Sequence, residues 1–223
     1  MSFYLSLNIF IISIPLLLSF ESRVRYVKRW PAVFFSILTV GVLYIVWDMV
    51  ATANGHWAFN PRYVGHLRIF NLPVEEILFF ITTPFSCLFV YEVINYFKKD
   101  KIITFKENRV YGVILFFLGM ALACYAQAYT ALAFIATAGF FFIAVKFFPN
   151  ILFSLNFWRY ILICYIPFVI FNGILTGIPV VQYNPQFIGG LRIISIPLED
   201  FVYNFSYLGF TLLAYKFILR KAR

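Results

Sequence analysis

Charged residues are scarce in this chain of 223 residues. They make up 12% of the sequence, against about 25% in a typical soluble domain, and only nine of them are acidic. Histidine occurs twice and cysteine three times, and neither has the spacing of a metal site or a disulfide framework. No Gly-x-Gly-x-x-Gly pattern follows a strand-like segment. We therefore expect no bound metal and no cofactor.

Apolar residues fill most of the chain, with 63% hydrophobic residues and a mean hydropathy of +0.88. A helix that crosses a bilayer needs roughly 20 mostly apolar residues. The sequence predicts an all-α integral membrane protein with seven such spans, over 2–20, 33–52, 74–97, 110–127, 129–148, 158–177 and 198–218. A tight turn near Gln127–Tyr129 divides the fourth span from the fifth, because a single helix of that length would overshoot the bilayer.

The basic residues predict the orientation of these spans. With the N-terminus outside the cell membrane and the C-terminus in the cytoplasm, 15 of the 18 Lys and Arg residues fall in cytoplasmic segments. The outer segments then hold only Arg62, Arg68 and Arg192. The net charge of +9 is thus explained by orientation and by attraction to anionic membrane lipid, and it does not call for nucleic acid. The first span is expected to be a retained helix rather than a signal peptide.

One polar sequence of 17 residues occurs twice, 124 positions apart and without gaps, at 60–76 and 184–200. The copies read NPRYVGHLRIFNLPVEE and NPQFIGGLRIISIPLED. Each ends in Pro-x-Glu followed by a second acid, and each runs directly into an apolar stretch. Four of the nine acids therefore lie where two spans begin, and ionisable groups at such positions suggest a function.

The repeat predicts how the helices are arranged. Helices one to three correspond to helices five to seven, and helix four connects the two sets. A shift by four helices preserves direction, so we expect parallel repeats related by an axis along the membrane normal. The expected parts are a first repeat over 1–100, a connector over 101–128 and a second repeat over 129–223. Both acid pairs would then face one shared cavity.

The acid pairs are the candidate catalytic groups: Glu75 with Glu76, and Glu199 with Asp200. Pro73 and Pro197 suit the first turn of a helix, where no backbone N–H is needed. Acids in that turn also cap a helix and complement its dipole, so capping alone is the competing interpretation. Because consecutive helical residues lie about 100° apart, only one acid of each pair can face the bundle axis. We take the identical acids, Glu75 and Glu199, as the leading proton donors.

Further polar residues of the repeat are candidates for supporting roles. Asn60 and Arg68 in the first copy match Asn184 and Arg192 in the second. Asp48 lies deep in the second span, where a partner role toward the motif acids or Arg68 competes with a structural hydrogen bond. Aromatic residues, 22% of the chain, offer faces that can stabilise a passing cation.

These two motifs in a seven-span chain resemble the small membrane-embedded lycopene cyclases, in the form that fuses two repeats. The resemblance covers essentially the whole chain. It implies an isomerase, or intramolecular lyase, that converts the linear ends of lycopene to β-ionone rings in carotenoid biosynthesis without net redox change. An acid protonates the terminal alkene, the neighbouring double bond attacks the cation, and a base removes a ring proton. The implied partners are a lipophilic carotenoid, membrane lipid and other carotenoid enzymes.

The resemblance carries a role onto Pro73, Pro197 and the four acids, and less directly onto the matched asparagines and arginines. Because the copies differ at Arg62/Gln186 and His66/Gly190, one half can be catalytic and the other architectural. A proton-coupled transporter and a cyclase making other rings or acting on longer carotenoids are the alternatives. A retinal photoreceptor would need a lysine in the middle of the last helix, where only Lys216 lies near, at its inner end.

Overall fold

The computed structural model describes residues 1–221, and every one of the seven predicted stretches is helical in it. The first is α1 (Phe3–Leu18), and the second is a continuous rod made of η1 (Tyr26–Arg29), α2 (Trp30–Ser36), the π-helical η2 (Ile37–Gly41) and α3 (Val42–Ala53). The others are α4 (Val74–Phe97), α5 (Glu107–Ala123), α6 (Ala128–Phe147), α8 (Leu155–Gly177) and α9 (Leu198–Lys221). The short α7 (Pro149–Leu152) precedes α8.

The fold is that of a helical membrane protein. Within residues 1–221, four helical segments are long and apolar enough to cross a bilayer, at Tyr26–Ala53, Val74–Phe97, Ala128–Phe147 and Leu155–Gly177. The second segment begins seven residues before its predicted start, because the hydroxyl of buried Tyr26 donates to the carbonyl of Phe85 and holds that turn against α4. The predicted turn near Gln127–Tyr129 lies slightly earlier, at 124–127.

Short strands occupy both repeated loops, which the sequence analysis did not predict. Within residues 1–221, they form three two-stranded antiparallel sheets. β2 (Arg68–Ile69) pairs with β3 (Leu72–Pro73), and β5 (Arg192–Ile193) pairs with β6 (Ile196–Pro197) in the same register. The third sheet joins the two loops, because β1 (Trp57–Phe59) pairs with β4 (Val181–Tyr183).

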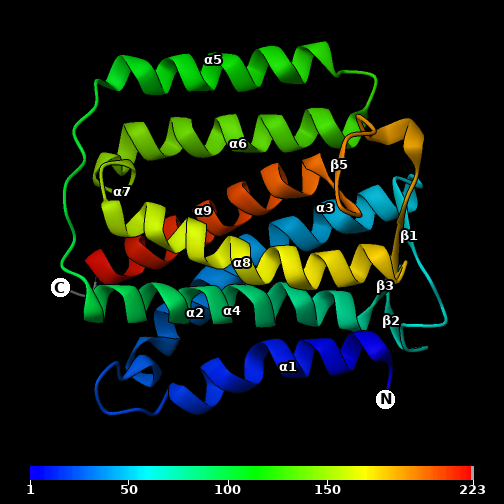
Figure 1. Cartoon of the computed structure of the whole chain (residues 1–223), viewed down its shortest axis with the longest axis horizontal. Helices are drawn as coiled ribbons and strands as arrows, with labels where there is room; N and C mark the ends of the chain where they lie inside the picture. The colour runs from blue at the N-terminus through cyan, green and yellow to red at the C-terminus, as the bar shows by residue number, and fades with distance from the viewer. Residues whose placement is uncertain (222–223) are drawn as a thin grey trace.

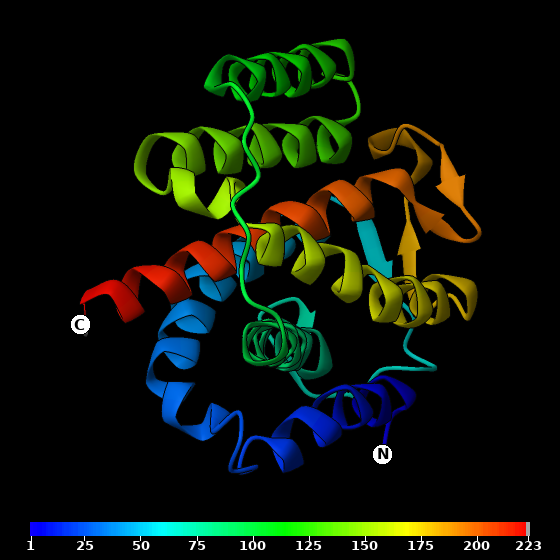
Figure 2. The same ribbon diagram turned by 60° about the vertical axis from the view of Figure 1, so that its left-hand side comes forward.

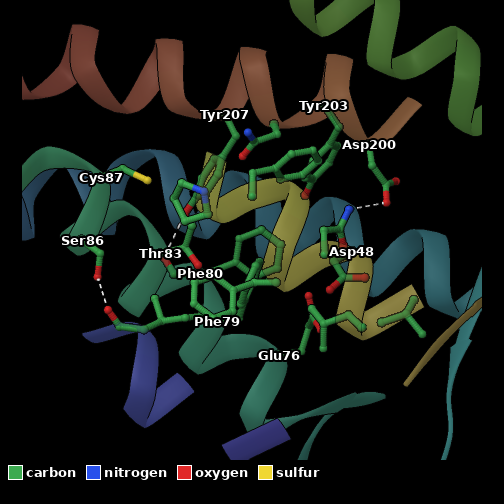
Figure 3. Close-up of a pocket in the computed structure, with 18 of the residues that line it drawn as sticks. Asp48, Glu76, Phe79, Phe80, Thr83, Ser86, Cys87, Asp200, Tyr203 and Tyr207 are labelled. Atoms are coloured by element: carbon green, nitrogen blue, oxygen red, sulfur yellow. Dashed lines mark hydrogen bonds between the residues drawn. The ribbon is translucent and has the colours of Figure 1, made fainter. Parts of the chain in front are cut away.

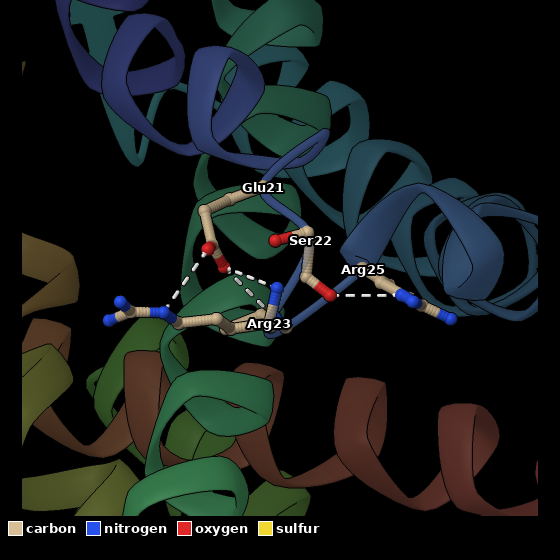
Figure 4. Close-up of polar contacts among 5 residues, drawn as sticks. Glu21, Ser22, Arg23 and Arg25 are labelled. Carbon is tan, nitrogen blue, oxygen red and sulfur yellow. Dashed lines mark hydrogen bonds and ion pairs between the residues drawn. The ribbon is translucent and has the colours of Figure 1, made fainter.

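The two ends of the bundle differ. The strands, the N-terminus and the first residues of α4 and α9 lie at one end, and the C-terminus lies at the other (Figure 1). The turn between α1 and η1 is held by its own side chains: Glu21 accepts from the backbone of Arg23 at 2.8 Å, and the Arg25 Nε donates to the carbonyl of Ser22 at 2.9 Å (Figure 4). This polar, basic turn lies at the end of the bundle away from the strands (Figure 1).

Helix α4 is the centre of the bundle. It packs against α1 and α8, and α9 crosses it. Figure 2 shows α4 almost end-on, surrounded by these helices. The hydroxyl of Tyr207 on α9 donates to the carbonyl of Phe80 on α4 at 2.8 Å. Helices α5 and α6 form a hairpin, and α6 packs on α9. The Cβ of an alanine at Gly209 would lie 2.6 Å from the Phe140 ring, so glycine permits this close approach.

Candidate active site

The repeated motif forms a hairpin followed directly by a helix in both halves. Pro73 and Pro197 end the strands β3 and β6, one residue before α4 and α9 begin, so the prediction that they occupy the first helical turn is off by one residue. The fixed φ of proline and its missing N–H suit this strand-to-helix junction. The motif thereby places two acids in the first turn of each helix.

The paired arginines close the hairpins. Arg68 Nη1 donates to the carbonyl of Asn71 at 2.9 Å, and Arg192 Nη1 donates to the carbonyl of Ser195 at 2.6 Å. Within residues 1–221 the ion pairs are Arg23–Glu21 and Arg29–Glu92, so neither motif arginine pairs with a carboxylate. The alternative in which Arg68 is the partner of Asp48 is therefore wrong, because the Arg68 guanidinium donates to the carbonyl of Asn71 in its own hairpin.

The matched asparagines also stabilise turns. Asn60 Oδ1 accepts from the backbone N–H of Arg62 at 3.0 Å, and Asn184 Oδ1 accepts from that of Gln186 at 3.1 Å. Such side-chain bonds two residues ahead are the usual reason for asparagine in a turn. Asn184 Nδ2 also donates to the carbonyl of Gly55, which links the two loops. Both asparagines shape the loops and do not line the cavity described below.

The first acid of each pair holds its loop. Glu75 Oε1 accepts from the backbone N–H of Gly65 at 2.7 Å, and Glu199 Oε1 accepts from that of Gly189 at 2.5 Å. A hydroxyl donates a second bond to each Oε1, at 2.5 Å in both cases: Ser2 to Glu75, and Thr130 to Glu199. The Oε2 of each of these acids is buried without a hydrogen-bond partner. A Cβ at Gly65 would lie 2.6 Å from the carboxylate oxygen, which explains why both copies have glycine there.

The second acid of each pair faces a cavity. Glu76 and Asp200 are both buried and line one pocket (Figure 3). Glu76 Oε2 accepts from the Tyr4 hydroxyl at 2.8 Å. Asp200 accepts from the hydroxyls of Tyr129 at 2.7 Å and Tyr183 at 2.8 Å, and from Asn172 Nδ2 at 2.8 Å. The geometry thus favours the second acids for chemistry, not the first acids that the sequence analysis preferred.

Asp48 supplies a third carboxylate to the same pocket. It is only 2% exposed, and its Oδ1 accepts from Trp57 Nε1 at 2.6 Å. Its Oδ2 is buried without a hydrogen-bond partner. A buried acceptor in that state is costly and calls for an explanation by function or by a bound group. The sequence analysis left open a partner role and a structural hydrogen bond for Asp48. The structure shows the hydrogen bond to Trp57 and places Asp48 in the same pocket as Glu76 and Asp200.

The sequence analysis named none of the three tyrosines that donate to the cavity-facing acids, Tyr4, Tyr129 and Tyr183. Tyr4 and Tyr129 occupy the second position of α1 and α6, and each donates to the cavity-facing acid of its own half. A signal existed, because helices one and five are repeat equivalents and both begin with an aromatic hydroxyl at the same helical position. Their offset of 125 residues differs by one from that of the motif, which hid the match.

The pocket is otherwise apolar and aromatic. It has a volume of about 260 Å³, and Phe79, Phe80, Tyr203 and Tyr207 form much of its wall. Trp57, Phe59, Val181 and Tyr183 from the β1–β4 sheet cover it at the loop end. The arrangement can move a proton between carboxyl groups while aromatic faces stabilise a positive charge and the covering sheet excludes water.

His56 lies beside this cover. Its ring stacks on Phe187 with 4.3 Å between ring centroids, and burial lowers the pKa of its imidazole below the ordinary value. Within residues 1–221, no group of three or more His, Cys, Asp and Glu side chains is placed to hold a metal ion. His56 therefore contributes to the packing between the two loops.

A comparison with known families decides the family of this chain. The model of the lycopene cyclase family matches residues 1–94 and 126–218. The chain belongs to the lycopene cyclase family. The resemblance recognised in the sequence is thereby confirmed, and a carotenoid cyclase function and a carotenoid substrate are supported. No curated protein and no solved structure matches the chain.

Proposed function

We propose that this chain is a lycopene β-cyclase, an isomerase that closes the linear ends of lycopene into β-ionone rings. The observation that carries the proposal is the pocket where Asp48, Glu76 and Asp200 meet under an aromatic wall. Proton donation to the terminal alkene would create a tertiary cation, which the neighbouring double bond attacks. Loss of a ring proton then completes a reaction in which one proton enters and one leaves, with no net redox change.

The number of hydrogen bonds that each acid accepts suggests its role. Asp200 receives three donated hydrogen bonds, which suits an acceptor that remains a carboxylate and faces the developing cation. Glu76 receives one, from Tyr4, and therefore has room for the proton that it donates as general acid. The unpartnered Oδ2 of Asp48 is free to accept the ring proton as general base. Between turnovers, release of that proton to water and reprotonation of Glu76 from water reset the site.

The aromatic wall would protect the intermediate. Phe79 and Tyr203 each lie four residues after the first acid of their motif and line the pocket. Tyr203 also packs edge-on against Trp47, with 4.8 Å between ring centroids. Aromatic faces stabilise cations by about 0.5–2 kcal/mol each, and more in a dry site. Neither a reductant nor a metal enters the balanced reaction.

The proposed membrane arrangement has seven spans, an outer N-terminus and a cytoplasmic C-terminus in the cell membrane. Two parallel repeats, at 1–100 and 129–223, flank a connector at 101–128. The matched hairpins and acids of both halves, and the unmatched stretch 95–125 between the family segments, support this division. Reporter fusions near residues 25, 65, 103, 152 and 190 test it. A cytoplasmic location for residues 65 and 190 would overturn the topology.

Expression in a lycopene-accumulating host, followed by pigment chromatography, tests the proposed activity. We expect β-ring products, and purified protein supplied with lycopene and a chelator in D₂O should incorporate one deuterium for every ring formed. Products with ε-type rings would assign a different proton loss to the same pocket. Unchanged lycopene with well-folded protein would reject the cyclase and favour the transporter alternative.

A further inference from the structure

The pocket extends far beyond the three carboxylates. From Glu76 it follows one face of α4 through Thr83 and Cys87 to Val90, more than halfway along that helix. The far part is lined by apolar residues of α1 and α8, among them Ile11, Pro15, Pro167 and Phe168. We refer to this far part, between α1 and α8 over α4, as the α1/α8 cleft.

The size of the pocket limits what it can enclose. Its volume of about 260 Å³ is below the roughly 300–1,000 Å³ of pockets that bury a drug-sized ligand. A carotenoid is a long, rigid polyene, so only one end group fits inside. The rest of the molecule must leave the pocket through an opening, and that opening must be apolar.

Specific contacts close the other sides. The β1–β4 sheet covers the loop end. Between α1 and α4, Ser86 Oγ donates to the carbonyl of Ile11 at 3.0 Å. Between α8 and α9, the Tyr165 hydroxyl donates to the carbonyl of Phe201 at 2.6 Å. Between the second helical rod and α9, Tyr44 and Ser206 share a hydrogen bond of 2.7 Å.

The boundary between α1 and α8 lacks such a closure. Within residues 1–221, no hydrogen bond joins these two helices, and their side chains meet in the edge-to-face pair of Phe10 and Phe171, with 6.0 Å between ring centroids. Phe10 is 63% exposed. Pro15 and Pro167 lie on the two sides of the cleft, and a proline inside a helix removes a hydrogen bond and bends it.

We propose that the α1/α8 cleft is the lateral opening through which the substrate reaches the site from the bilayer and in which its polyene arm rests during catalysis. This proposal rests on the proposed cyclase function. The end group lies at the carboxylates, the arm runs along α4 toward Val90, and the remainder lies among lipid acyl chains. The bound arm needs no polar partner, which agrees with the apolar lining of the cleft.

A substitution that blocks the cleft, assayed with a long and a short substrate, tests the proposal. Val90→Trp fills the cleft far from the acids, and Val90→Phe is a milder version in case the larger residue impairs folding. Leu115→Trp is the matched control, because Leu115 is 68% exposed on α5 and does not line the pocket. Each protein is assayed in liposomes with lycopene and with an acyclic isoprenoid that carries the same end group but is short enough to fit inside the pocket.

We expect the ratio of lycopene turnover to short-substrate turnover to fall by about 10²-fold in Val90→Trp, the scale of a misplaced reacting group, and by less in Val90→Phe. The ratio should be unchanged in Leu115→Trp. An unchanged ratio in both Val90 variants, with active wild-type protein, would overturn the cleft proposal and leave an ordinary acyl chain as its occupant. Wild-type protein that cyclises neither substrate would instead reject the cyclase function itself.

Discussion

The two halves of this chain share a scaffold but differ in the hydrogen bonds around their second acids. In both halves, a glycine N–H and a hydroxyl donate to the first acid, and an arginine closes the hairpin. In both, a tyrosine at the second position of a helix donates to the second acid. Two pairs of positions around the second acids differ: the first half has Asp48 and Phe59 where the second has Asn172 and Tyr183. Asn172 donates to Asp200, whereas Asp48 keeps an unpartnered oxygen.

This difference is the reason why we propose one reaction centre with unequal contributions from the two halves. The first half supplies Glu76 and Asp48, whose oxygens have room to give and take a proton. The second half supplies Asp200, held by three donors. The duplication thus preserved the parts that position the acids, while the hydrogen bonds around them diverged.

Substitutions at positions 48 and 172 should have the largest effect on ring formation. Asp48→Asn removes the proposed base, and we expect ring formation to fall by about 10²–10⁴-fold at equal membrane abundance. Asn172→Asp removes a donor from Asp200 and adds a buried charge, so it should lower both activity and thermal stability. Chromatographic rates normalised to folded protein measure both. Near wild-type turnover in Asp48→Asn would show that the halves do not differ in this role.

The two tyrosines provide a finer comparison. Tyr4→Phe removes the hydroxyl that Glu76 accepts from, and we expect about a tenfold lower kcat with little change in KM, equivalent to about 1.4 kcal/mol. Tyr129→Phe removes one of three donors to Asp200 and should cost less. Steady-state kinetics in liposomes measure both variants. Equal losses would indicate that the second acids act symmetrically.

The glycines test the shared scaffold. An alanine Cβ would lie 2.6 Å from the Glu75 carboxylate at Gly65 and 3.1 Å from the Glu199 carboxylate at Gly189. We expect Gly65→Ala to destabilise the protein by about 1–3 kcal/mol, as overpacking usually does, and Gly189→Ala to cost less. Thermal unfolding in detergent gives the order. The reverse order would contradict the loop-holding role of Glu75.

The smallest effect concerns the hairpin tips, where the halves should behave alike. Phe70 and Ile194 have φ values of 55° and 60°, a conformation that costs a non-glycine residue about 1–2 kcal/mol, and both side chains are exposed. Phe70→Gly and Ile194→Gly should each raise the melting temperature slightly. Leu67→Gly and Leu191→Gly, at positions without positive φ, are the controls and should lower it.

Sequence periodicity and the repeat predicted much of this molecule. The apolar runs placed the helices, because a bilayer demands long apolar segments, and the duplicated motif placed all four acids at helix starts. The sequence could not predict which acid of each pair faces the cavity and which holds the loop, because this depends on the direction in which each residue of the first helical turn points. Identity between copies favoured Glu75 and Glu199, yet the feature that both copies preserve there is the hydrogen bond to a loop glycine.

The loop contacts were also out of reach from the sequence. The pairing of β1 with β4 joins residues 57–59 to 181–183, and three-residue strands carry little periodic signal. Tyr183 and Trp57, which donate to Asp200 and Asp48, come from that sheet. Two of the polar partners of the cavity acids thus depend on a long-range pairing that only the folded chain reveals.

We propose that the second acid of each motif performs the chemistry while the first holds the loop. The most direct measurement is the rate of ring formation per folded molecule for Glu75→Gln, Glu76→Gln, Glu199→Gln and Asp200→Asn, with melting temperatures measured alongside. We expect Glu76→Gln to lose about 10²–10⁴-fold in rate and Asp200→Asn to be impaired as well. The two first-acid variants should lose mainly stability, about 1–3 kcal/mol. Active Glu76→Gln together with inactive, stably folded Glu75→Gln would contradict this proposal.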